Sequence, residues 1–82
     1  MKKIEHIGIA VEDMGKAEKI FSTIFRKPSY KSGEVISEGV KTSFFKVGNS
    51  KIELLSATNS NSPITKFLKK NREGMHHIAF AV

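Results

Sequence analysis

The sequence predicts a small α+β fold with the element order β, α, β, β, β, α, β. Three patterns predict it: strand-like alternation over residues 3–11, helical spacing of apolar residues after Asp13, and short β-rich runs divided by glycines over residues 34–56. The 82 residues are 39% hydrophobic and 27% charged, which is typical of one globular domain with a single core.

The first strand, at residues 3–11, carries β-branched residues on one face, as expected of a strand packed on helices. Asp13 is a good N-cap for the helix that follows. Lys27-Pro28 ends this helix near Arg26, because the residue before a proline avoids the helical region. The apolar residues at helical spacing are Ala17, Ile20, Phe21, Ile24 and Phe25.

The rest of the chain reads as four strands and one short helix. The expected strands are residues 34–38, 40–47, 50–56 and 75–82. Ser62 followed by Pro63 predicts the start of the second helix, which ends near Asn71. The core between sheet and helices is expected to contain Ile7, Ile9, Val11, Phe21, Phe25, Ile52, Leu54 and Ile78.

Composition narrows the classes of function. The net charge of +6 and the pI of about 9.8 favour an anionic partner, but the lysines are scattered and no nucleic-acid-binding signature accompanies them. The cluster Lys66, Lys69, Lys70 and Arg72 is interpreted as a solvated last helical turn. No apolar run approaches the ~20 residues of a membrane span, and no secretory signal is evident, so we expect a cytoplasmic protein. The absence of cysteine leaves His, Asp and Glu as the strong metal ligands.

The stretch EHIGIAV at residues 5–11 returns as HHIAFAV at residues 76–82. Both copies place a histidine and two small residues on one face of a strand. These faces are His6, Gly8 and Ala10 in the first copy, and His77, Ala79 and Ala81 in the second. Small residues beside a good ligand leave volume unfilled, which predicts the wall of a cavity.

Glu53, in the run KIELL, is a third candidate for this site. A carboxylate within an apolar strand is costly to bury without a cation, so it faces either solvent or a metal. Together with His6 and His77 it would suit Co, Mn, Ni, Fe or Zn, with coordination positions left open for a substrate. Such a divalent ion could stabilise the enolate formed when a proton next to a carbonyl is removed.

The runs KIELL, SPITKFL and GMHHIAF, in this order after EHIGIAV, resemble the first half of the methylmalonyl-CoA epimerases. This family lies within the glyoxalase and bleomycin-resistance, or vicinal oxygen chelate, superfamily. The resemblance implies paired βαβββ modules with sheets curled around a divalent metal, a CoA thioester substrate, and inversion at C2 through an enediolate. It implies metal-ligand roles for His6, Glu53 and His77, a first module at residues 1–74, and the first strand of a truncated second module at residues 75–82.

The chain departs from the family pattern in length. The family is about twice as long, and its fourth ligand, a glutamate thought to move the proton, lies in the second module beyond Val82. Some members have an acid in the second of the central strands, where this chain has Val40, Lys41, Thr42 and Ser43. The catalytic base is therefore unassigned. Two alternatives stay open: another enzyme of the superfamily, such as a lactoylglutathione lyase or a ring-cleaving dioxygenase, and a non-catalytic small-molecule-binding dimer.

A homodimer is also expected. A strand at residues 75–82 without further strands of its own module would leave an exposed edge and an apolar face. Two chains could cover these surfaces by module pairing across a two-fold axis, or by exchange of residues 75–82. We expect the dimer to form by exchange or pairing of this strand.

Overall fold

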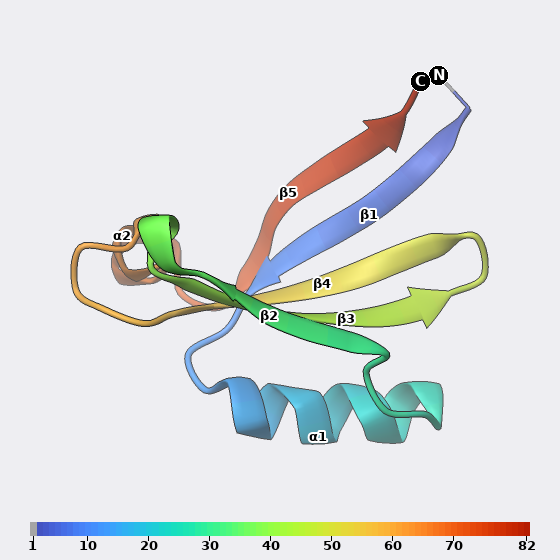
Figure 1. Cartoon of the computed structure of the whole chain (residues 1–82), viewed down its shortest axis with the longest axis horizontal. Helices are drawn as coiled ribbons and strands as arrows, with labels where there is room; N and C mark the ends of the chain where they lie inside the picture. The colour runs from blue at the N-terminus through green and yellow to red at the C-terminus, as the bar shows by residue number, and fades with distance from the viewer. Residues whose placement is uncertain (1) are drawn as a thin grey trace.

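The computed structural model describes residues 2–82 and folds them into one five-stranded mixed sheet with two helices (Figure 1). The strands are β1 (Lys3–Ala10), β2 (Lys31–Val35), β3 (Val40–Val47), β4 (Ser50–Ala57) and β5 (Gly74–Ala81), and the helices are α1 (Met14–Phe25) and α2 (Pro63–Asn71). The strand order is β2-β3-β4-β1-β5, with β1 and β4 parallel and the other pairs antiparallel. The predicted α+β class and element order are confirmed, and the sheet is open.

Both helices begin at the residues that the sequence indicates. The side chain of Asp13 accepts a hydrogen bond from the backbone N–H of Lys16 at 3.0 Å, and Ser62 caps α2 through the N–H of Ile64 at 3.1 Å. Pro63 occupies the first turn of α2, where its missing N–H costs nothing. In the described residues, neither helix is long and apolar enough to cross a membrane.

Helix α1 covers one face of the sheet beneath β3 and β4 (Figure 1). The centre of this core is Phe45, which is fully buried and contacts the rings of Phe21 and Phe25 at centroid distances of 6.2 and 5.6 Å. Its buried members are Val11, Ala17, Phe45 and Leu54, and its half-buried members are Ile9, Met14, Phe21, Phe25 and Ile52. Most of the predicted core therefore lies under α1.

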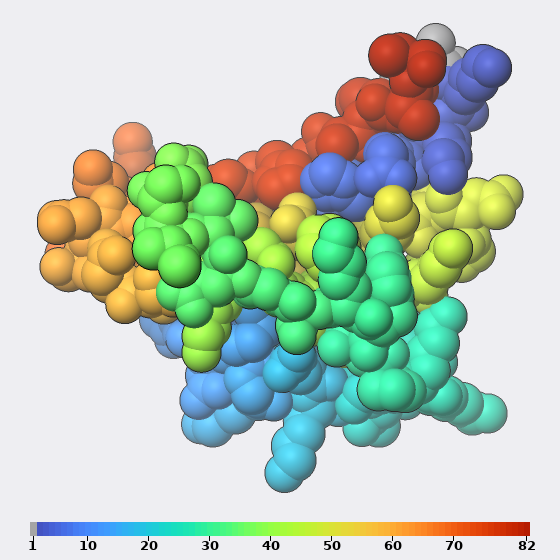
Figure 2. All heavy atoms as spheres, in the orientation of Figure 1, coloured from blue at the N-terminus to red at the C-terminus, as the bar shows by residue number. Residues whose placement is uncertain are grey.

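Helix α2 packs on the opposite face, at one end of the sheet. Its Ile64 is buried against Ala10, Val40 and Leu55. The α2 cluster is smaller than the α1 cluster, and it leaves the middle of β1, β4 and β5 uncovered on this face. The paired ends of β1 and β5 stand away from the rest of the chain (Figure 2).

The strand predicted at residues 34–38 is wrong in its position. The structure places β2 at Lys31–Val35, and a 3-10 turn at Ile36–Glu38 follows it. Gly39 ends that turn with a φ of 65°, a left-handed conformation that glycine adopts without strain, so that Val35 can pair directly with Val40. The strand begins earlier than predicted because Tyr30 and Lys31 pack on Phe44 of β3.

The predicted core also needs correction at its edges. Ile78 is 42% exposed, because α1 covers β3 and β4 rather than β5. Ile20 and Ile24, which share the apolar spacing of α1 but were not in the predicted core, are 58% and 62% exposed. Phe45 was missing from the predicted core, because the pair Phe44-Phe45 puts one ring on each face and the sequence does not indicate which face α1 covers.

Strands β1 and β5 form a long antiparallel pair with two shifts of register. Ile4 pairs with Phe80 and His6 with Ala79, so that Glu5 is an extra residue in β1. Further along, Gly8 pairs with His77 and Ile9 with Met75, so that His76 is an extra residue in β5. Each strand thus contains one β-bulge.

We predict that Phe45→Ala lowers the free energy of unfolding by about 3–5 kcal/mol, because it removes the centre of the α1 core. Ile24→Ala is the matched control on the exposed side of α1 and should change the free energy of unfolding by at most about 0.5 kcal/mol. Urea titrations followed by circular dichroism measure both values. A loss below about 1 kcal/mol for Phe45→Ala would contradict the described packing.

Candidate metal centre

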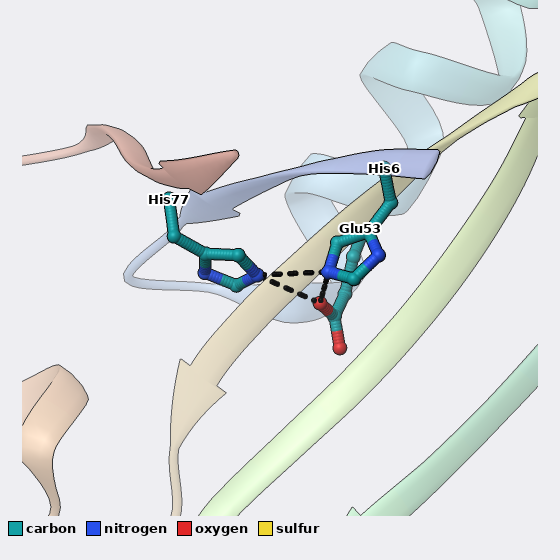
Figure 3. A group of neighbouring side chains, drawn as sticks. All are labelled: His6, Glu53 and His77. Atoms are coloured by element: carbon teal, nitrogen blue, oxygen red, sulfur yellow. Dashed lines mark hydrogen bonds and ion pairs between the residues drawn. The ribbon is translucent and has the colours of Figure 1, made fainter. Parts of the chain in front are cut away.

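Three side chains from three strands meet on the face of the sheet opposite α1. His6 comes from β1, Glu53 from β4 and His77 from β5 (Figure 3). The Nε2 atoms of the two histidines lie 3.0 Å apart, and each is 3.4 Å from Glu53 Oε1. All three side chains are partly buried. These are the three residues that the sequence analysis selected, and the structure brings all of them together.

The register of the sheet explains this convergence. Gly8 pairs with Glu53 across the parallel β1–β4 ladder and with His77 across the antiparallel β1–β5 ladder. Gly8 therefore lies between the two side chains, and His6 precedes it by two residues on the same face.

Gly8 makes room for the ring of His77. A Cβ atom at position 8 would overlap the His77 ring at its Cε1 atom. The small residue after His6 was interpreted as unfilled cavity volume. The structure shows instead that the imidazole of His77 occupies the space over Gly8.

The geometry of the three ligand atoms fits a divalent ion. With metal–ligand bonds of about 2.1 Å, neighbouring ligand atoms lie about 3.0 Å apart in octahedral and about 3.4 Å apart in tetrahedral coordination. The observed separations of 3.0, 3.4 and 3.4 Å fall at these values. Two imidazole nitrogens and one carboxylate oxygen form a donor set suited to Zn, Fe, Co, Ni or Mn, and one face remains for other ligands.

The charge around His6 favours its metal-binding tautomer. Its Nδ1 donates a hydrogen bond to Glu5 Oε1 at 3.0 Å, and Lys51 contacts the other oxygen of Glu5 at 3.0 Å. The hydrogen bonds from His6 and Lys51 lower the pKa of Glu5, so that this carboxylate is ionised and can only accept. The proton of neutral His6 therefore lies on Nδ1, and the lone pair of Nε2 points toward His77 and Glu53.

Burial favours the neutral form of the His77 ring. It lowers the pKa of His77 below its ordinary value and outweighs the opposite effect of the Glu53 charge. A neutral imidazole is the form that binds a metal. Burial of His77 thus favours the form of its ring that can bind a metal.

The segment that could have carried an acid in β3 supplies no base. Val40 is buried in the α2 cluster, and Ser43 is buried on the α1 side, where it donates a hydrogen bond to Glu18 at 2.7 Å. Thr42 contacts the carbonyl oxygen of Gly33. In the part of the chain that the structure describes, Glu5 and Glu53 are the carboxylates in contact with His6 or His77.

Three neighbours of the site were not selected from the sequence: Glu5, Lys51 and His76. Glu5 and His76 each directly precede one of the two histidines, and on a regular strand adjacent residues point to opposite faces. In the repeat E-H-I and H-H-I a polar residue precedes each histidine, but only the bulges of β1 and β5 let that residue contact its neighbouring histidine.

Comparison with known proteins gives a consistent result. Residues 5–82 match the model of the Glyoxalase/Bleomycin resistance protein/Dioxygenase superfamily. Human mitochondrial methylmalonyl-CoA epimerase is 37% identical over 81 residues, a match that covers 98% of this chain and 46% of the human protein. The protein YqjC of Bacillus subtilis, which is uncharacterised, is 34% identical over 80 residues, or 98% of this chain and 57% of YqjC.

Among solved structures, a variant of Streptomyces coelicolor methylmalonyl-CoA epimerase in complex with 2-nitronate-propionyl-CoA aligns with a TM-score of 0.90 and 31% identity. That alignment covers 98% of this chain and 61% of the other. The chain therefore spans about half the length of the curated relatives it matches. From its sequence match and its fold, the chain belongs to the glyoxalase/bleomycin resistance protein/dioxygenase superfamily.

Proposed function

We propose that this chain is the first βαβββ module of a metal-dependent methylmalonyl-CoA epimerase, with residues 1–74 as that module and residues 75–82 as the first strand of a second. The observation that carries the proposal is the convergence of His6, Glu53 and His77 to within coordination distance of one point. Similarity to named epimerases over 98% of the chain supports the choice of reaction.

His6, Glu53 and His77 would hold a divalent ion, for which Co, Mn, Ni, Fe and Zn are the candidates. Such an ion supplies positive charge that stabilises the oxyanion developing on a thioester carbonyl when the C2 proton is removed. Glu5 keeps the proton of His6 on Nδ1, away from the site. The group that moves the C2 proton is not assigned among the described residues, and in the proposal the second module supplies it.

The proposed substrate is a CoA thioester. The structure of the Streptomyces coelicolor enzyme contains 2-nitronate-propionyl-CoA, and 61% of that chain aligns with the fold of this one. The net charge of +6 would favour a polyanionic ester. An enzyme of the lactoylglutathione lyase type would act on a glutathione thioester instead.

Because no described residue is assigned as the base, a second candidate is a binding module without catalysis. This module would use the same three ligands and bind a CoA ester, but it would not remove the C2 proton. Exchange with solvent separates the two functions, because only proton removal introduces deuterium at C2.

We further propose a homodimer that covers the free edge of β5. On the part of the sheet that α1 does not reach, Ile4, Ile78 and Phe80 are 40%, 42% and 52% exposed. Exchange or pairing of residues 75–82 between two chains would bury these side chains and continue the sheet.

Replacing His6 with Ala is expected to lower the content of bound divalent metal at least about tenfold, since loss of one ligand leaves two. Atomic emission after dialysis against Co²⁺ or Mn²⁺ measures it. Ile24→Ala, on the far side of the sheet, is the control and should bind metal as the native protein does. Unchanged metal content in the His6 variant would assign His6 a structural role.

In D₂O, the metal-loaded chain joined to a second module is expected to introduce deuterium at C2 of methylmalonyl-CoA faster than its His6→Ala variant does, because a group of the second module removes that proton. Mass spectrometry of the recovered ester gives the rate. Equal rates for both proteins, together with thermal stabilisation by the CoA ester, would identify a binding module. Stabilisation by a glutathione thioester alone would favour a lyase.

Light scattering at micromolar concentration is expected to give twice the chain mass of 9.1 kDa. Deletion of residues 75–82 should return the protein to a monomer if strand exchange forms the dimer, because it removes the exchanged segment. A native mass near 9.1 kDa would contradict the dimer.

A further inference from the structure

The β-bulges of β1 and β5 place a second polar residue beside each histidine of the candidate metal centre. In β1 the extra residue is Glu5, directly before His6, and in β5 it is His76, directly before His77. Adjacent residues of a regular strand point to opposite faces, and a bulge changes the direction of one of them. Each bulge thus lets neighbours in sequence contact each other through their side chains.

Both contacts are made to the Nδ1 atom, the ring nitrogen that faces away from the site. Glu5 Oε1 lies 3.0 Å from His6 Nδ1, and His76 Nδ1 lies 2.9 Å from His77 Nδ1. The Nε2 atoms of His6 and His77 face each other and Glu53 (Figure 3). The two strands therefore repeat one arrangement, with a bulge residue on Nδ1 and the candidate metal position on Nε2.

We propose that Glu5 and His76 are positioning residues that hold His6 and His77 in the tautomer and orientation required for metal binding. The inference rests on the proposed metal site and extends it to residues that do not touch the ion. An acceptor on Nδ1 keeps the proton there and leaves the Nε2 lone pair for the ion. Glu5 is such an acceptor as an ionised carboxylate, and the unprotonated Nδ1 of His76 is one for His77.

Each positioning residue is itself held by a different part of the fold. Lys51 of β4 forms an ion pair with Glu5 at 3.0 Å. Phe67 of α2 contacts the ring of His76 edge to face, with 4.9 Å between centroids. His6 is thereby tied to the central strand of the sheet, and His77 is tied to the helix that covers its end.

The two partners differ in charge, and their effects should differ accordingly. A negative carboxylate on Nδ1 raises the basicity of an imidazole more than a neutral ring nitrogen does. Loss of Glu5 is therefore expected to weaken metal binding more than loss of His76.

Matched pairs of variants in the full 82-residue chain test the proposal. Glu5→Met and His76→Leu keep the size of the side chain but cannot accept a hydrogen bond, whereas Glu5→Gln and His76→Asn keep an acceptor oxygen. Titration with Co²⁺, followed by its visible absorption, is expected to show affinities about 10- to 100-fold weaker for the first pair. Glu5→Gln and His76→Asn should keep most of the native affinity for Co²⁺. The two variants at each position should have similar melting temperatures.

A second readout is the Nδ1 proton of His77 in the Zn²⁺ complex. NMR is expected to detect it, protected from solvent exchange, in the native protein and in His76→Asn, but not in His76→Leu. Native-like Co²⁺ affinity in Glu5→Met and His76→Leu would overturn the positioning role while leaving the metal site intact. Equal loss of Co²⁺ affinity in the two variants at one position, for example Glu5→Met and Glu5→Gln, would also overturn it, because the loss would then not depend on the acceptor. Failure of the native protein to bind Co²⁺ or Zn²⁺ would overturn both proposals.

Discussion

The antiparallel pairing of β5 with β1, with the ring of His77 over Gly8, is the constraint on which the candidate site depends. β1 is the only strand that borders both β4 and β5 in the described sheet, so it sets the distance between Glu53 and His77. A side chain at position 8 would overlap the imidazole. Residues that are far apart in the sequence thus meet because Gly8, in the strand between β4 and β5, has no side chain.

The uneven cover of the two helices gives the site its access. Helix α1 buries one face of β3 and β4 around Phe45, which stabilises the sheet without using the opposite face. Helix α2 is short and buries Ala10 and Leu55 at one end of that opposite face. On the part of that opposite face that α2 does not cover, His6, Glu53 and His77 are partly buried.

Much of this arrangement could be predicted from the sequence, because it follows from local patterns. The caps at Asp13 and Ser62 and the alternation of the first and last strands along the chain predicted the element order, and the repeat of His-small-small predicted His6 and His77. The start of β2 could not be predicted, since it depends on how Tyr30 and Lys31 pack on Phe44. The exposure of Ile78 depends on which strands α1 covers, and the helical periodicity of α1 does not indicate this. Glu5 and His76 were missed because a bulge is a property of the pairing between two strands.

We propose that the sheet brings His6, Glu53 and His77 into position to share one divalent ion. Anomalous diffraction from crystals of the protein grown with Mn²⁺ or Co²⁺, recorded at the absorption edge of the metal, tests it most directly. One anomalous peak is expected at about 2.1 Å from the Nε2 atoms of both histidines and from a Glu53 oxygen. A peak on other residues, or density showing the three side chains in contact without an ion at saturating metal, would contradict it.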